Sequence, residues 1–218
     1  HRPNRRQRQM CIRDRSSADE RRPNGILEET ATHHAREKTL DLSASDVWQM
    51  TKLASAEYLE YGVTTASAGG MPKALASLLG PMSEYNQIPL RVALFPWFNE
   101  VGSELVSGEV TLSEFSGGRV VVPRVKIIAD GSIQGFTGYL SQPYHRPYKG
   151  DADYRGYPAV LREALFEQVE GLYRQRVQVA IHGNGDASIE DALDAIEAAA
   201  SKYPCLLYTS PSPRDDVI

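Results

Sequence analysis

Four short apolar runs alternate along the chain with longer stretches in which apolar residues recur at helical spacing. The runs have the length of buried strands and lie at residues 63–66, 90–95, 120–129 and 177–181. The stretches of helical spacing lie at residues 43–61, 73–86, 161–175 and 189–202. Strand–helix–strand connections of this length cross over a sheet and favour parallel pairing. The chain is therefore predicted to be an α/β protein of about four βα units.

Two of the predicted strands carry polar side chains at positions that suggest chemistry. The sequence Val-Lys-Ile-Ile-Ala-Asp-Gly-Ser at residues 125–132 places Lys126 inside an apolar run and Asp130 at its end. The sequence Val-Ala-Ile-His-Gly-Asn-Gly-Asp at residues 179–186 places His182 at a strand end, before a glycine turn and a helix. Because active sites of βα barrels gather at the carboxyl ends of the strands, both stretches are candidate site segments.

Lys126 has three interpretations. A lysine within an apolar strand is unfavourable unless it is paired or modified. A desolvated amine with a lowered pKa can form a Schiff base, or it can take up carbon dioxide as a carbamate that bridges two metal ions. The third interpretation is a lysine on the outer face of the strand, with its ammonium group reaching water between helices.

The other polar residues of these stretches also leave alternatives. His182 is either a metal ligand or a core histidine bonded to the backbone. Asp130 is either a turn residue or a carboxylate of the pocket. For Asp186 we predict an N-cap rather than a base. The adjacent His33 and His34 are predicted to be a surface pair, because neighbouring helical side chains point about 100° apart.

A long stretch between the third and fourth predicted strands, residues 131–157, has no strand or helix pattern and is rich in glycine, proline and tyrosine. A structureless stretch of this length in a compact domain is usually functional. We predict a lid, and its tyrosines indicate an apolar or aromatic substrate.

The two ends of the chain resemble a sequencing-adaptor sequence. Residues 10–15, Met-Cys-Ile-Arg-Asp-Arg, can be encoded by the DNA word whose reverse complement encodes Cys-Leu-Leu-Tyr-Thr-Ser at residues 205–210. We therefore expect residues 1–15 and 205–218 to be adaptor-derived and disordered, and residues 16–204 to be the protein domain, a partial barrel.

Composition excludes several function classes once those ends are set aside. Both cysteines, Cys11 and Cys205, lie in the ends, so neither a disulfide framework nor a thiolate metal site is expected. The net charge of the whole chain is −4, and the main basic run lies in the N-terminal end, which argues against a nucleic-acid partner. No apolar run is long enough to cross a membrane. We expect a cytoplasmic protein.

Taken together, the motifs resemble amidohydrolase family 3, in the branch of the N-substituted formamide deformylase-like hydrolases. The resemblance extends over residues 23–204 and includes Gly-Ile-Leu-Glu-Glu at 25–29, Gly-Val-Thr-Thr at 62–65 and the two site segments. It implies a TIM-like (β/α)8 barrel, of which about four units are present. It also implies hydrolysis of a non-peptide, amide-like carbon–nitrogen bond in a small molecule by a metal-activated water.

The resemblance also implies roles for individual residues. Lys126 corresponds to a carboxylated lysine that ligates the metal, and His182 corresponds to a metal-ligand histidine. We expect Lys126 and Asp130 to be catalytic groups, Lys126 and His182 to bind the metal, and the cofactor to be one or two divalent ions, zinc by preference. The family's His-x-His is absent, and its later histidine and aspartate would follow residue 205, so this chain is expected to be an inactive fragment.

Two other function classes remain open from the sequence. One is a Schiff-base lyase or aldolase-type barrel that uses Lys126 without a metal. The other is a non-catalytic relic of a barrel.

Overall fold

The computed structural model describes residues 15–16, 19–23, 42–85 and 88–203. The chain divides into two compact units, residues 1–49 and 50–218. In the described part of the first unit, β1 (Arg15–Ser16) and β2 (Asp19–Pro23) pair antiparallel. The predicted pair His33 and His34, and most of the two predicted adaptor segments, lie outside the described residues.

A long helix, α3 (Ala44–Glu60), follows, and its bounds agree with the predicted helix at residues 43–61. At its start the Ser43 hydroxyl accepts a hydrogen bond from the Asp46 backbone N–H, and the Asp46 carboxylate accepts one from the Ser43 N–H. This reciprocal pair satisfies backbone donors that the first turn would leave free. Gly62 ends the helical run with a φ of 74°, which a residue without a side chain adopts readily.

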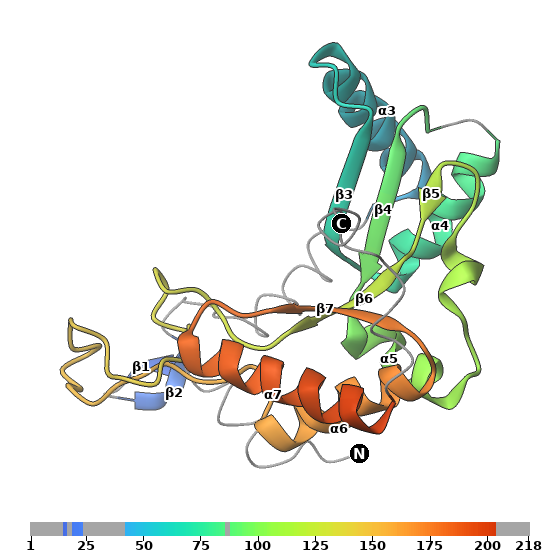
Figure 1. Ribbon diagram of the computed structural model, residues 1–218. Coiled ribbons are helices and arrows are strands. Elements are labelled where there is room, and N and C mark those ends of the chain that lie inside the picture. The colour runs from blue at the N-terminus through green and yellow to red at the C-terminus, as the bar shows by residue number, and fades with distance from the viewer. Residues whose placement is uncertain (1–14, 17–18, 24–41, 86–87, 204–218) are drawn as a thin grey trace, which may run out of the picture. The chain divides into compact units, whose positions relative to one another are not determined.

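The second unit alternates strands and helices in the predicted order (Figure 1). Its strands are β3 (Thr65–Met71), β4 (Arg91–Pro96), β5 (Val120–Val121), β6 (Arg124–Ile128) and β7 (Gln178–His182). Its helices after α3 are α4 (Lys73–Glu84), α5 (Phe98–Ser107), the 3₁₀ helix η2 (Leu112–Phe115), α6 (Arg162–Arg174) and α7 (Asp186–Lys202).

The strands of this unit pair parallel. β3, β4 and β5 form one sheet, β6 and β7 form another, and a single parallel bridge between Trp97 and Lys126 lies between them. The predicted single strand at residues 120–129 is therefore two short strands, β5 and β6, separated at Val122 and Pro123. Proline has no N–H to donate to a neighbouring strand, so it interrupts the ladder there.

The Ser-Ala-Gly-Gly sequence at residues 67–70 has the composition of a turn, but it is strand. β3 continues through these residues to Met71. A Cβ atom added to Gly70 would lie 2.4 Å from the indole nitrogen of Trp97, so only glycine fits against this ring. Here glycine indicates a close approach of the backbone to a side chain, not a turn.

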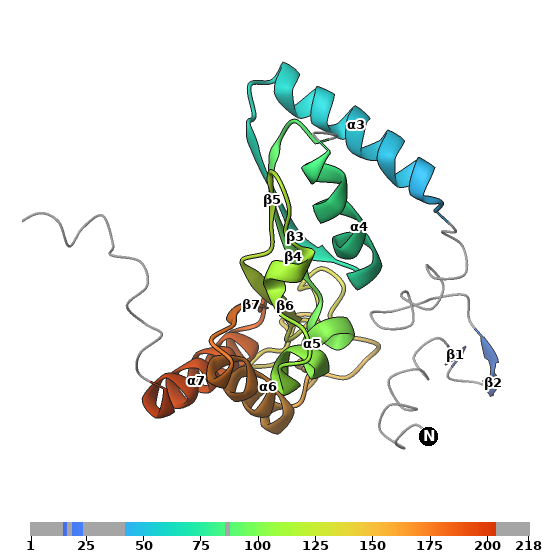
Figure 2. The same cartoon turned by 90° about the vertical axis from the view of Figure 1, so that its right-hand side faces the viewer.

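Part of the core of the second unit lies between β6 and the helices. Val125 and Ile127 of β6 are fully buried, and α6 contributes Leu165, Val169 and Leu172. α6 contacts α7 and β7, and α5 contacts β6 (Figure 2). The buried face of β6 is therefore the one turned toward the helices.

The buried face of α7 leaves out two of its large aliphatic residues. Ile189 and Leu193 recur at helical spacing, but they are 43% and 61% exposed. The buried residues are small: Ser188, Ala192, Ala195, Ala199 and Ala200. A stripe of alanines lets the α7 backbone approach α6 closely, which larger aliphatic residues would prevent.

In the described part of the chain, no helix combines the length and the apolar character needed to cross a membrane.

Candidate active site at the carboxyl ends of β6 and β7

Lys126 and His182 lie on the same face of two neighbouring parallel strands. Lys126 is in register with Ala180, and Ile128 is in register with His182. Side chains two residues apart on a strand share a face, as do those of residues in register. With about 4.8 Å between strands and about 3.3 Å per residue, the two Cα atoms are roughly 8 Å apart. Both side chains can therefore reach one small ligand.

The face that carries Lys126 is turned away from the helices. Residues along β6 alternate between fully buried and more exposed, with Val125 and Ile127 on the helix side and Lys126 on the other. Burial lowers the pKa of the Lys126 ammonium group from its ordinary value, because desolvation disfavours the charged form. The structure therefore does not support the third interpretation, in which the Lys126 ammonium group reaches water between the helices.

Asp130 is completely buried and holds three segments of chain together. Its carboxylate accepts hydrogen bonds from the backbone N–H groups of Tyr139 (2.8 Å), Asn184 (2.9 Å) and Gly185 (2.8 Å). A carboxylate used in this way fixes the turn after β7 and the start of the long loop. These contacts favour a positioning role over the catalytic role that we predicted for Asp130.

Asn184 is a site residue to which the sequence analysis gave no role. Its side-chain nitrogen lies 3.0 Å from Nε2 of His182 and donates to the backbone oxygen of Gly131 over 2.7 Å. The side chain thus joins the ends of β6 and β7 next to the candidate ligand. Its position within the Gly-Asn-Gly turn was the only sign of this role in the sequence.

The loop at residues 131–157 has no helix or extended strand, as predicted, but it has a core of its own. The rings of Phe136, Tyr144, Tyr148 and Tyr154 form neighbouring pairs with centroids 4.8–6.1 Å apart. The Tyr144 hydroxyl donates to the Gly138 oxygen and the Tyr154 hydroxyl to the Phe136 oxygen. The tyrosines therefore pack against one another, and the use of this loop as a lid stays a prediction.

Asp186 connects this loop to α7. The N-cap of α7 is Gly185, so the prediction that Asp186 is the N-cap was wrong by one residue. The Asp186 carboxylate instead accepts hydrogen bonds from the N–H of Ser141, over 2.8 Å, and from the Ser141 hydroxyl. These bonds lower the pKa of Asp186 because they stabilise its charged form.

We expect the stability that Asp186 contributes to depend on pH in a defined direction. A carboxyl group with a lowered folded-state pKa stabilises the fold above its unfolded-state pKa of about 3.9. That contribution disappears as the pH falls through the lowered value. The melting temperatures of the chain and of Asp186→Asn should therefore differ by a constant amount above about pH 5 and converge below about pH 4. A difference that stays constant down to pH 2 would contradict the assignment.

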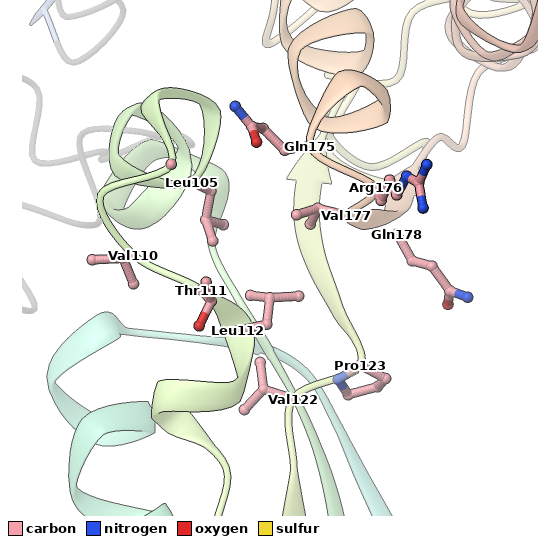
Figure 3. A pocket seen from close by; sticks show the side chains of 11 residues that line it. Leu105, Val110, Thr111, Leu112, Val122, Pro123, Gln175, Arg176, Val177 and Gln178 are labelled. Atoms are coloured by element: carbon pink, nitrogen blue, oxygen red, sulfur yellow. The ribbon is translucent and has the colours of Figure 1, made fainter. Parts of the chain in front are cut away.

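A pocket of about 460 Å³ lies at the opposite end of the same strands. Its lining includes Leu105, Val122, Pro123, Val177 and Gln178, which come from α5 and from the beginnings of β6 and β7 (Figure 3). Gln178 begins the strand that His182 ends, which separates the two residues by roughly 13 Å along β7. In barrel enzymes the amino-terminal ends of the strands contribute stability, so we do not assign chemistry to this pocket.

The metal ligands that the described residues offer are few. No group of three or more histidine, cysteine, aspartate or glutamate side chains comes together among the described residues. His182 provides one imidazole. Lys126 provides an amine that becomes an oxygen ligand only after modification.

Comparison with known proteins identifies a family. The model of the amidohydrolase family, Amidohydro_3, matches residues 4–208. The protein named "Putative amidohydrolase YtcJ" of Bacillus subtilis is 27% identical over 168 residues, which are 76% of this chain and 28% of that protein.

Two solved structures share the fold. A crystal structure of an uncharacterized metal-dependent hydrolase from Pyrococcus horikoshii superposes with a TM-score of 0.65, at 25% identity, over 87% of this chain and 38% of that one. One from Pyrococcus furiosus has a TM-score of 0.63 at 22% identity, over 82% of this chain and 38% of that one. The likeness confirms an α/β fold with parallel strands, consistent with part of an amidohydrolase barrel.

The chain thus spans roughly a third of the length of these relatives. The family model, by contrast, covers nearly the whole chain, including the two segments with the candidate ligands. This chain belongs to the amidohydrolase family.

Proposed function

We propose that this chain supplies part of the site of a metal-dependent hydrolase that cleaves a non-peptide, amide-like carbon–nitrogen bond in a small molecule. The observation that carries the proposal is the shared face of β6 and β7, on which Lys126 and His182 lie two residues apart in register. Family membership supports the reaction class, and the Pyrococcus horikoshii neighbour, a metal-dependent hydrolase by its title, supports the metal.

The two side chains fit a zinc-like cation. Neutral imidazole is a common nitrogen ligand of zinc. A lysine ammonium cannot be a ligand, but the neutral amine of Lys126 can attack the carbon of carbon dioxide. A nitrogen–carbon bond forms as one carbon–oxygen π bond of carbon dioxide opens, and one N–H proton leaves to water. The product is a carbamate whose single negative charge is shared by two oxygens. Because burial lowers the pKa of Lys126, more of its amine is in the neutral form that reacts.

When bound, a divalent cation acidifies a water molecule and polarises the carbonyl group under attack. Zinc sites of enzymes use three protein ligands and keep one open position. Lys126 and His182 provide two of the three in this proposal, and a third ligand would complete the site. In this proposal Asp130 holds the turn that follows His182, because its carboxylate accepts hydrogen bonds from three backbone N–H groups.

The carbamate is tested by ¹³C NMR of the chain in ¹³C-labelled bicarbonate. We expect a carbamate signal of Lys126, which disappears in Lys126→Met, beside the signal of the N-terminal amine, whose ordinary pKa of about 8 also permits the reaction. The matched control is Lys202→Arg, because Lys202 pairs with Glu170 over 2.6 Å and this raises the pKa of Lys202, so its amine stays protonated. A spectrum that loses no signal in Lys126→Met would contradict the assignment of Lys126.

Zinc binding is tested by calorimetry with zinc chloride. We expect one saturable site that His182→Ala removes, and no detectable zinc-dependent hydrolysis of formanilide by this chain alone, because the ligand set is incomplete. Equal zinc binding by the wild-type chain and His182→Ala would contradict the metal site. Formanilide hydrolysis by the chain would contradict the incomplete site.

The lowered pKa of Lys126 also suits a Schiff-base lyase or aldolase. Borohydride would then trap an aldehyde such as glycolaldehyde on Lys126, and Lys126→Met would prevent the trapping. Carbamate formation without such trapping favours the hydrolase.

A further inference from the structure

The hydrogen bonds of Asn184 determine which way its side-chain amide points. One end of the amide lies 2.7 Å from the backbone oxygen of Gly131. A carbonyl oxygen only accepts, so the group facing it must be the NH₂ of Asn184 and cannot be its oxygen. The orientation of this amide is therefore fixed by an acceptor that has no alternative state.

The same NH₂ group lies 3.0 Å from Nε2 of His182. Its first hydrogen points to Gly131, and its second is available for the imidazole. Since an NH₂ group cannot accept, Nε2 must accept with its lone pair. A neutral imidazole carries one proton, so in this arrangement the proton of His182 is on Nδ1.

Asn184 is also anchored through its backbone. Its N–H donates to Oδ1 of Asp130 over 2.9 Å, and the next residue, Gly185, donates to Oδ2 of the same carboxylate. Asp130 is fully buried, the bond from Gly185 is buried, and the bond from Asn184 is partly buried. The side chain of Asn184 is thus held from both ends, beside the histidine that follows Ile181 in β7.

We propose that Asn184 is a positioning residue that fixes both the ring direction and the tautomer of His182. A cation that binds Nε2 must displace the Asn184 amide. A cation that binds Nδ1 requires that the Nδ1 proton leaves and that Nε2 takes one up, which also ends the hydrogen bond from Asn184. The importance of this for catalysis rests on the proposed function, but the tautomer itself does not.

The experiment is long-range ¹H–¹⁵N NMR of the 218-residue chain with ¹⁵N-labelled histidine, without metal, in alkaline buffer where imidazole is neutral. Loss of one set of ring signals in His182→Ala assigns the residue. We expect the protonated nitrogen of His182 to be Nδ1 in the wild-type chain. In Asn184→Ala the proton should move to Nε2, the position that free histidine favours.

Asn184→Asp is the matched variant, because it keeps the shape and the bond from the backbone N–H to Asp130. It loses the bond to the Gly131 oxygen and presents an oxygen that accepts from Nε2–H. It should also place the proton on Nε2, and it provides the test if Asn184→Ala does not fold. A wild-type ring protonated on Nε2, or a proton that stays on Nδ1 in both variants, overturns the proposal. Because no metal is added, the result is independent of whether the zinc and carbamate experiments succeed.

Discussion

Replacing Asp130 with alanine is expected to lower the free energy of unfolding by about 3–5 kcal/mol. The change removes a fully buried acceptor from the N–H groups of Tyr139, Asn184 and Gly185; the bond from Gly185 is buried and the other two are partly buried. Each unsatisfied buried donor costs about 1–3 kcal/mol, and partial entry of water reduces the sum. Urea unfolding measures the loss. Because domains are stable by only about 5–15 kcal/mol, this is a large fraction of the total.

The control is Asp130→Asn, which has the same shape but only one acceptor oxygen. Its one oxygen can still accept from the N–H groups of Tyr139 and Gly185, while its NH₂ group faces the N–H of Asn184. The free energy of unfolding should therefore fall less than in Asp130→Ala. Hydrogen exchange gives a local check, since the three amides should lose protection more than the core of α6. If the free energies of unfolding of both variants lie within about 0.5 kcal/mol of the wild-type value, Asp130 does not hold this turn.

Replacing Gly185 with alanine is expected to cost about 3 kcal/mol, because there is no space for a Cβ atom. The added carbon would lie 1.8 Å from the backbone oxygen of Tyr139 and 2.3 Å from its carbonyl carbon. These are backbone atoms, so the loop would have to move as a whole. The same movement would pull the Tyr139 N–H away from the Asp130 carboxylate. The backbone amide hydrogen of Tyr139 should therefore exchange with solvent faster.

Gly69→Ala is the matched control. Nothing lies within 4 Å of a Cβ atom built there, and its backbone does not require glycine. Both substitutions reduce the entropy of the unfolded chain equally, so their difference isolates the steric cost at Gly185. We expect Gly69→Ala to change the unfolding free energy by less than about 1 kcal/mol. Equal losses for the two variants would contradict the close contact of Gly185 with Tyr139.

The alternation of strands and helices could be predicted because burial imposes a period on the sequence. The apolar runs around Lys126 and His182 identified β6 and β7, and parallel pairing followed from the length of the connections. The positions of the two candidate ligands at neighbouring strands therefore came from local pattern alone.

Contacts between distant segments could not be predicted in this way. Asp130 bonds to residues 9, 54 and 55 positions away, and no periodic pattern records such bonds. The same limit applies to Asn184 and to the pairing of Asp186 with Ser141. The exposed Ile189 and Leu193 show a related limit, because hydrophobicity alone did not reveal that alanines give the closer helix contact.

The proposed function depends most on whether Lys126 and His182 bind the same cation. NMR of the chain in ¹³C-labelled bicarbonate with added cobalt(II) tests it directly, because a paramagnetic ion broadens only signals close to it. We predict that cobalt broadens both the carbamate signal of Lys126 and the ring signals of His182, and that the carbamate signal stays sharp in His182→Ala. Broadening of only one of the two groups, or equal broadening of the carbamate without His182, would contradict the shared site.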